Sequence, residues 1–248
     1  KNETVNYWCT TKSPNNQGVH FLEQVRMKAA KETKWDKLYD PETKSLFSRL
    51  EEFVINTYFS GAFTRAILAA SNIKRGKIFE PGSGGGMACA KFAIQGFDVT
   101  SMDLSENALH KGKNLFRQMG LEAKFALGDL FHIPIKNEEF DLVFNQGVME
   151  HFRLANLDPS NGIKEMLRVL KKNGTLVILV PAYFSPLFLI YHFFKTFNLV
   201  NKYWPYTDQD FLHKHELYDM MKKAGCENIV VRRVWSSLFF SMIGYCKK

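Results

Sequence analysis

The sequence predicts a doubly wound α/β fold built on a mostly parallel sheet. From Lys77 onward, short apolar and β-branched runs alternate with helical stretches of about 10–15 residues, which is the pattern of βαβ units. Two of the runs, 140–144 and 176–180, are apolar almost throughout, as expected of parallel strands covered on both faces. A glycine-rich segment joins the first run to the first helix, where such folds place a tight turn.

The residues before this alternation predict a helical N-terminal cap over 1–72. Pro41 suits the first turn of a helix, and apolar residues follow it at helical spacing from Leu46 to Thr57. A second apolar set begins at Phe63 and leads into Ser71-Asn72, a plausible helix end. We therefore expect one helical cap, 1–72, and one α/β domain, 73–248.

Within the α/β domain the expected elements follow in order. Strands are predicted at 77–80, 98–102, 122–127, 140–145 and 175–180, and helices at 85–95, 105–119 and 163–170. The segment 171–174, Lys-Lys-Asn-Gly, predicts the end of the third helix and a turn. An aromatic insert at about 182–212 precedes a helix predicted at 213–224. Two last runs, 228–234 and 237–246, are separated by so few residues that they predict an antiparallel hairpin.

The composition excludes several classes of protein. A chain of 248 residues with 46% hydrophobic, 14% aromatic and 23% charged residues is not a disordered chain. Its cysteines show no CxxC pair, so neither a disulfide scaffold nor a metal finger is expected, and we expect no metal. The opening residues contain no apolar leader. Polar residues interrupt the most hydrophobic stretch, 182–200, so a transmembrane helix is not expected there. A reducing, cytoplasmic location is the expectation. The net charge of +8 permits an acidic substrate, nucleic acid or an anionic membrane and selects none of them.

The strongest motif is Glu80-Pro-Gly-Ser-Gly-Gly-Gly86, between a predicted strand and a predicted helix. Glycines at 82, 84 and 86 let the backbone turn tightly and let a ligand lie against it. The dinucleotide fingerprint GxGxxG would need glycine at 87 or 89, where the chain has Met87 and Cys89. The pattern is instead an acid followed by GxGxG.

Further polar residues come after the next predicted strands. Asp103 ends the second strand, where a carboxylate can accept both hydroxyls of a ribose, while Ser105 is better placed to cap the next helix. Gly128-Asp129-Leu130 comes after the third strand, and 140–151, FDLVFNQGVMEH, spans the fourth strand and the residues directly after it. All these segments belong to the carboxyl edge of the sheet, where parallel sheets bind ligands.

With these motifs in this order, the sequence resembles the class I S-adenosylmethionine-dependent methyltransferases of the small-molecule type. The resemblance covers about residues 77–181 strongly and 213–246 more loosely. It implies a Rossmann-like, seven-stranded sheet whose antiparallel hairpin is at the C-terminus. The domain 73–248 would then be the methyltransferase domain, with S-adenosyl-L-methionine as its cofactor.

The resemblance also implies a role for individual residues. Glu80, Gly82 and Gly84 would line the methionine portion of the cofactor, and Asn145 would border the methionine amine and the reactive methyl. Asp103 would bind the ribose and Leu104 would pack on the adenine. Asp129 and the backbone N–H of Leu130 would bind the adenine edge.

A general base is needed only to deprotonate the acceptor, and His151 is the candidate because it comes after the fourth strand. The sequence equally permits His151 to pack on or cap the next helix. His213 and His215 flank the insert; a solvated helix start is expected for both, and the alternative is that they face the pocket.

The insert after the fifth strand, 182–212, admits three interpretations: a helix packed on the core, a lid over the acceptor, or a membrane contact. Pro186 suits the first turn of a helix there. A lid would use Phe188, Tyr191, Phe194 and Trp204, and Trp35, Tyr39, Tyr58 and Phe59 of the N-terminal region would close the other side.

Methyl transfer to a small hydrophobic or aromatic acceptor, with oxygen favoured over nitrogen and carbon, is the leading functional hypothesis. A nucleotide-dependent oxidoreductase is disfavoured by the glycine spacing. A nucleic-acid methyltransferase is disfavoured because Asn145-Gln-Gly-Val148 replaces the Pro-Pro motif of the amino-methylating type. A lipid-directed enzyme and a binding protein without transfer activity stay open. The sequence does not predict the oligomeric state.

Overall fold

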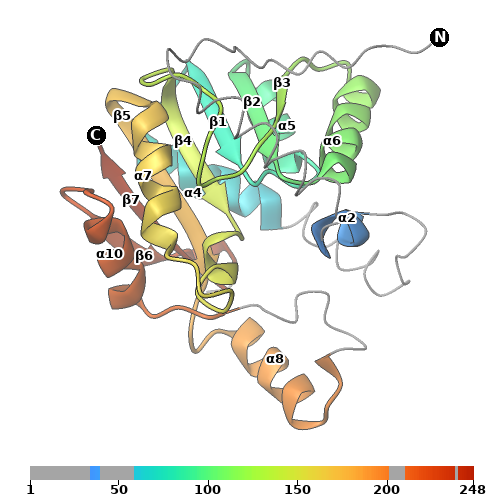
Figure 1. The fold of residues 1–248 in the computed structure, drawn as a ribbon, viewed down its shortest axis with the longest axis vertical. Coiled ribbons are helices and arrows are strands. Elements are labelled where there is room, and N and C mark those ends of the chain that lie inside the picture. The colour runs from blue at the N-terminus through green and yellow to red at the C-terminus, as the bar shows by residue number, and fades with distance from the viewer. Residues whose placement is uncertain (1–33, 40–58, 201–209, 238–239) are drawn as a thin grey trace, which may run out of the picture.

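The computed structural model describes residues 34–39, 59–200, 210–237 and 240–248. Its centre is a seven-stranded sheet with the order β3-β2-β1-β4-β5-β7-β6 (Figure 1). The strands are β1 (Lys77–Pro81), β2 (Asp98–Asp103), β3 (Lys124–Leu127), β4 (Phe140–Gln146), β5 (Leu170–Pro181), β6 (Val230–Arg233) and β7 (Ser241–Lys247). All neighbours are parallel except that β7 runs antiparallel to β5 and β6. The predicted doubly wound, mostly parallel sheet is confirmed.

Helices cover both faces of this sheet (Figure 1). One face packs against α4 (Ser60–Ser71), α5 (Met87–Ile94) and α6 (Glu106–Met119), and the other against α7 (Pro159–Val169) and α10 (Lys214–Lys223). The central strands alternate between the two cores, so that Val177 and Leu179 of β5 face α4 and α5, while Ile178 faces α7 and α10. This two-sided burial explains the continuous apolar runs in the sequence.

Local signals fix several helix ends as predicted. The Ser105 side chain caps α6 by accepting a hydrogen bond from the Ala108 N–H at 3.2 Å. Asn72 comes after α4 with a φ of 53°, a left-handed conformation that ends the helix. The helix predicted after Pro41 lies outside the described residues.

The start of β5 and the connection from β6 to β7 differ in part from expectation. As predicted, α7 ends just before 171–174, at Val169, and Asn173 has a left-handed φ of 65°; the segment nevertheless belongs to β5, which begins at Leu170, pairs with Phe140 and pairs with β4 again from Thr175 after a register shift. The last two strands are not joined by a tight turn, because residues 234–240 lie between them and include the short helix η3 (Trp235–Ser237). The predicted pairing of β6 with β7 is nevertheless present.

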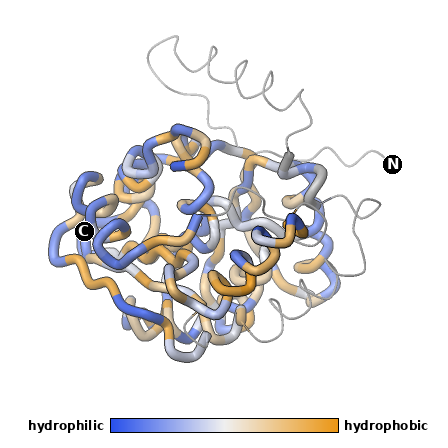
Figure 2. The backbone as a smooth tube through the Cα atoms, turned by 90° about the horizontal axis from the view of Figure 1, so that it is seen from below, coloured by the Kyte–Doolittle hydropathy of each residue, from blue (hydrophilic) through white to orange (hydrophobic). Residues whose placement is uncertain are grey.

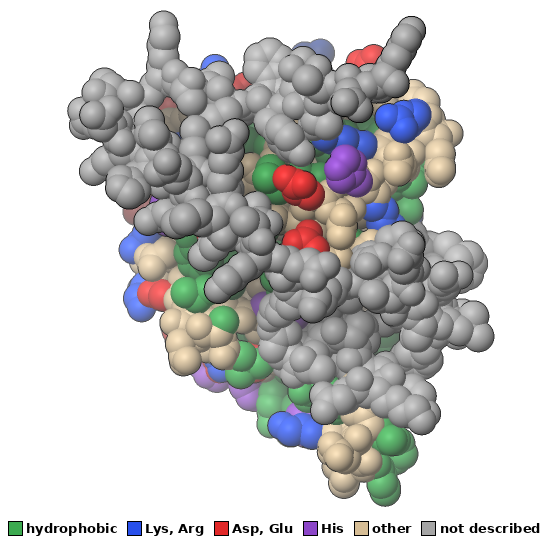
Figure 3. Space-filling model, turned by 45° about the vertical axis from the view of Figure 1, so that its right-hand side comes forward, with side chains coloured by type: hydrophobic (Ala, Val, Ile, Leu, Met, Phe, Trp, Pro, Cys, Tyr) green, Lys and Arg blue, Asp and Glu red, His purple; other side chains and the backbone are tan. Residues whose placement is uncertain are grey.

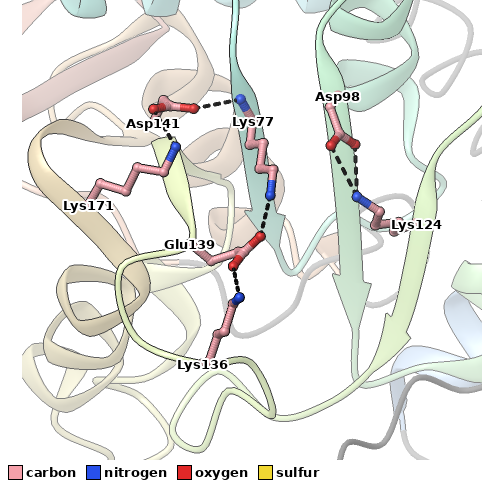
Figure 4. Close-up of polar contacts among 7 residues, drawn as sticks. All are labelled: Lys77, Asp98, Lys124, Lys136, Glu139, Asp141 and Lys171. Atoms are coloured by element: carbon pink, nitrogen blue, oxygen red, sulfur yellow. Dashed lines mark hydrogen bonds and ion pairs between the residues drawn. The ribbon is translucent and has the colours of Figure 1, made fainter.

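Ion pairs line the amino edge of the sheet, opposite the motif-bearing carboxyl edge (Figure 4). Lys77 at the start of β1 contacts Glu139 at 2.5 Å, and Lys171 of β5 contacts Asp141 at 2.8 Å. The Lys77 ammonium holds the pKa of Glu139 below its usual range. These groups are partly exposed, so each pair contributes little to stability.

The insert leaves and rejoins the body at one place. Ala182 and Leu212 form an isolated bridge, the Tyr183 N–H donates to the Leu212 carbonyl at 2.9 Å, and the Leu212 N–H donates to the Pro181 carbonyl at 3.1 Å. Between these ends, α8 (Pro186–Thr196) extends from the lower end of the molecule in Figure 1. Pro186 occupies its first turn, as the sequence predicts for a helix start. Ser185 caps the helix by accepting a hydrogen bond from the Phe188 N–H.

Candidate functional site

The glycine loop between β1 and α5 provides a backbone cradle. Gly82, Gly84 and Gly86 have φ values of 72°, 53° and 72°, which side chains rarely adopt. The N–H groups of Gly82 and Ser83 both donate to the Met102 carbonyl, at 2.7 and 3.0 Å, and so dock the loop on β2. A Cβ at Gly82 would lie 2.6 Å from Val148 Cγ2, so only glycine fits between the loop and the segment after β4.

Asp103 joins this loop to the end of β2. Its Oδ2 accepts from the Gly84 N–H at 2.8 Å and its Oδ1 from the Ser105 N–H at 2.9 Å. Burial raises the pKa of Asp103, and the backbone N–H groups of Ser105 and Gly84 oppose that rise. A carboxylate has about four acceptor positions, so two further hydroxyl groups can be accepted.

Glu80 of β1 is buried beneath the loop. Its carboxyl accepts a hydrogen bond from the Cys89 thiol of α5 at 3.2 Å. Burial raises the pKa of Glu80 to about 8, and the negative charge of Asp103 adds to the rise. Glu80 is therefore protonated at neutral pH unless a cation lies beside it. The sequence motif predicts Glu80, whereas nothing in the sequence identifies Cys89 as its partner.

Asn145 of β4 contributes a buried amide. Its Nδ2 donates to the Pro81 carbonyl at 2.6 Å, which ties the end of β4 to the end of β1. Its Oδ1 is buried and has no hydrogen-bond partner within the described part of the chain. Buried acceptors are normally satisfied, so this oxygen is available to a donor of a bound ligand.

The remaining predicted cofactor residues lie at the same edge. Asp129 comes after β3, and its Oδ1 accepts from the Phe131 N–H at 2.9 Å, while Leu104 directly follows Asp103. The Gly128 N–H donates to the Asp103 carbonyl at 3.0 Å and links the two loops. The Leu130 side chain is buried in the core that includes α7, so only its backbone remains for a ligand.

His151 lies at this edge on the short helix η2 (Met149–His151). It is buried, and its ring lies edge-on to Trp35 with the centroids 4.9 Å apart. Trp35 belongs to α2 (Lys34–Tyr39). This placement fits a residue that packs, and a catalytic role for His151 remains a prediction.

Helix α2 spans the loops of the site. The Ser105 hydroxyl donates to the Asp36 carboxylate at 2.6 Å, and the Tyr39 hydroxyl lies against Gly84 closely enough that a Cβ there would collide with it. The sequence pointed to Trp35 and Tyr39 because they are aromatic, whereas no sequence signal marks Asp36. Tyr58 lies outside the described residues.

The aromatic insert forms its own small core. Phe188 and Tyr191 of α8 are buried and meet the Phe211 ring at 5.5 and 5.3 Å. The His213 ring packs on Tyr183 at 4.0 Å, and His213 and His215 are exposed at the start of α10. Trp204 lies outside the described residues.

Arg153, which comes after η2, connects the insert to the site. Its guanidinium contacts Asp210 at 3.0 Å, at the returning end of the insert, and Glu216 of α10 at 2.6 Å. Sequence reasoning missed this residue because its partners lie about sixty residues away.

No helix among the described residues is long and apolar enough to cross a membrane. No group of three or more His, Cys, Asp or Glu residues in the described ranges could hold a metal ion.

Comparisons with known proteins agree with this geometry. Residues 79–178 match a family model described as "Methyltransferase domain". A demethylmenaquinone methyltransferase from Staphylococcus aureus is 30% identical over 166 residues, which cover 61% of this chain and 66% of the relative. The chain therefore spans just under two thirds of the length of that relative.

Solved structures share the fold at low identity. A SAM-dependent methyltransferase from Thermotoga maritima superposes with a TM-score of 0.60 at 20% identity, covering 81% of this chain and 94% of that one. The [4+2]-cyclase SpnF superposes with a TM-score of 0.57 at 17% identity, covering 75% and 80%. At these identities the likeness concerns the fold alone, and the cyclase shows that the fold serves more than one reaction.

Proposed function

We propose that this chain transfers a methyl group to a small hydrophobic or aromatic acceptor. The premise is that it carries a class I S-adenosylmethionine-dependent methyltransferase domain of the small-molecule type. Oxygen is the first candidate for the acceptor atom, before nitrogen and carbon. The name of the S. aureus relative, a demethylmenaquinone methyltransferase, supports a small organic acceptor. The cytoplasmic location expected from the sequence stays a prediction.

The residues at the carboxyl edge fit the cofactor. Gly82 lets the loop approach Val148 so closely that no Cβ fits between them, and Asn145 Oδ1 is a buried acceptor that lacks a partner among the described residues. We assign Asp103 to the ribose hydroxyls, Leu104 to the adenine face, and Asp129 with the Leu130 backbone to the adenine edge. Glu80, Gly82, Gly84 and Asn145 would hold the methionine portion.

When bound, the cofactor supplies a methyl group that its sulfonium has already activated. The chain therefore has to orient the acceptor, exclude water and remove one proton, and orientation alone can supply much of the reduction in barrier. His151 is the proposed residue for proton removal when the acceptor is a hydroxyl. The packing of Trp35 on its ring fixes the orientation of the imidazole.

One observation carries the proposal most directly: the 2.8 Å hydrogen bond between Gly84 and Asp103. It joins the glycine loop and the acid at the end of β2 into one surface, so that a single ligand can contact both. Since Asp103 lies directly at the strand end and keeps free acceptor positions, a nucleoside ribose is the group that suits it.

Calorimetry with S-adenosylmethionine, its demethylated product and NAD tests the cofactor assignment. We expect both sulfur compounds to bind and NAD not to bind; the reverse result would refute the proposal. Asp103→Ala should weaken cofactor binding at least about tenfold, because two charge-assisted hydrogen bonds of about 1.5–3 kcal/mol each are lost.

The matched control is Asp98→Ala, which removes an exposed carboxylate at the other end of β2. It should leave the affinity unchanged. If Asp103→Ala unfolds, Asp103→Asn retains the shape and one acceptor oxygen, and normal cofactor binding by a folded Asp103 variant would contradict the ribose assignment. Methyl transfer from radiolabelled cofactor then separates an active enzyme from a binding protein.

A further inference from the structure

Helix α8 presents hydrophobic side chains to solvent. Leu189 is 62% exposed and Phe193 is 57% exposed, and they lie one turn apart on the same face. Ile190 and Phe197 are also exposed, and the Phe193 and Phe197 rings meet at 4.8 Å. We call Leu189, Ile190, Phe193 and Phe197 the outer face of α8. In the view from below, α8 is a largely hydrophobic helix at the front of the molecule (Figure 2).

The outer face is not needed to hold α8 in place. Phe188 and Tyr191, on the opposite side, already bury themselves against Phe211. A helix that only packs on a globular body carries polar residues on its outward side. The outer face of α8 is therefore apolar for another reason, since contiguous exposed apolar patches mark contact sites.

The exposed apolar surface continues beyond the helix. Phe184, two residues before α8, is largely exposed, and its ring lies 5.6 Å from that of Phe188. Arg233 of β6 donates to the carbonyls of Tyr183 and Phe184, and the exposed Trp235 comes two residues later. Hydrophobic side chains gather at this lower end of the molecule in Figure 3.

The residues around α8 carry cations and no acid. Residues 182–207 contain Lys195 and Lys202 and no Asp or Glu, and the two acids of the insert, Asp208 and Asp210, come at its returning end, where Asp210 pairs with Arg153. Lys195 is exposed in the last turn of α8, and the whole chain carries a net charge of +8. Aromatic and aliphatic side chains beside cations, without acids, are the composition of helices that lie in an anionic lipid interface.

We infer that the outer face of α8, with Phe184 beside it, docks this protein on the surface of an anionic lipid bilayer. The rings enter the boundary between headgroups and acyl chains, while Lys195 meets lipid phosphates. Phe188, Tyr191 and Phe211 stay in the protein and anchor the helix. This docking does not depend on methyl transfer, and its test uses no acceptor.

Sedimentation with vesicles tests the inference. The full chain is mixed with phosphatidylcholine vesicles that contain or lack phosphatidylglycerol. We expect binding to the anionic vesicles that weakens as salt is raised, because the cations contribute about 1 kcal/mol each near the surface. Leu189→Ser with Phe193→Ser should reduce the partition coefficient at least about tenfold, since two buried apolar side chains are lost.

The matched control is Ile94→Ser with Leu154→Ser. These side chains are 59% and 55% exposed, on α5 and in the segment before α7, and their replacement removes similar apolar surface elsewhere. The control should bind vesicles as the wild type does. Equal melting temperatures of the two double variants and undisturbed cofactor binding exclude unfolding as the cause of a loss.

Three results would overturn the inference. The first is no sedimentation of the wild type with anionic vesicles. The second is equal binding by the wild type and the Leu189/Phe193 variant, or equal binding to neutral and anionic vesicles. The third is a wild-type dimer in sedimentation velocity that the same variant turns into a monomer, because the outer face would then bind a second copy of this chain.

Discussion

The pH dependence of folding should report the buried carboxyl of Glu80. Burial raises its pKa from the usual 4.5 to about 8 in the folded protein, whereas the unfolded chain restores the usual value. The folded protein therefore keeps a proton that the unfolded chain releases. The contribution of Glu80 to stability is complete below about pH 4.5 and is lost as the pH rises to about 8. At 1.36 kcal/mol for each pKa unit, the loss is at most about 5 kcal/mol.

Urea unfolding of the wild type and of Glu80→Gln measures the pH-dependent contribution of Glu80 to the free energy of unfolding. Glutamine has nearly the same shape and cannot ionise, so the other titrating groups cancel when the two proteins are compared. We expect the free energy of unfolding of the wild type to fall relative to that of the variant by several kcal/mol between about pH 5 and pH 8. The control Glu122→Gln changes an exposed carboxyl and should follow the wild type.

Parallel pH curves for the wild type and Glu80→Gln would refute the reasoning, because Glu80 would then ionise in the folded protein as it does in water. A cationic cofactor beside Glu80 should favour its ionised form. Repeating the titration with saturating S-adenosylmethionine should therefore flatten the difference between the two proteins.

Two further substitutions test the packing around the site and the insert. Gly82→Ala should cost about 1–2 kcal/mol of backbone strain and about 1–3 kcal/mol more from overpacking, and should weaken cofactor binding, because its φ is positive and its Cβ would lie 2.6 Å from Val148. Gly96→Ala, with positive φ but open space, should cost only the backbone strain of about 1–2 kcal/mol and leave binding intact. If both alanines weaken cofactor binding alike, the close approach at Gly82 has no role. Phe188→Ala should lower the free energy of unfolding by about 3–5 kcal/mol in urea titration, whereas the exposed Phe193→Ala should change it by less than about 0.5 kcal/mol; similar costs would mean that α8 packs through its other face.

The sheet and the glycine loop could be predicted from the sequence because their signals are local. The run 140–144 is apolar on both faces, which predicts a buried strand. Gly82 and Gly84 predict a tight turn because glycine readily adopts positive φ, as both residues do here. The location of Asp103 could be predicted because the last residue of a parallel strand lies at the carboxyl edge of the sheet, where ligands bind. These features depend on a few neighbouring residues each.

Other features depend on partners distant in sequence and could not be predicted. In the sequence, nothing distinguishes Arg153 from the other Lys and Arg residues. Its role becomes visible only in the structure, where Asp210 and Glu216 lie beside it. The contact of Asp36 with Ser105 spans 69 residues and has no periodic signal. The start of β5 was missed because Lys171 and Lys172 resemble a helix end, whereas Leu170 already pairs with Phe140 of β4, and pairing with β4 resumes at Thr175 after a register shift. Tertiary pairing overrode local propensity there.

The closure of the insert at Ala182 and Leu212 has a consequence for how this fold can change over time. Because the chain departs and returns at one bridge, the length and content of the excursion do not alter the register of β5 or the start of α10. The segment between them can therefore be replaced as one unit without changing the flanking elements. Replacement of that one contiguous stretch can change the surface at this end of the molecule, while Asp103 and the glycine loop are inherited unchanged.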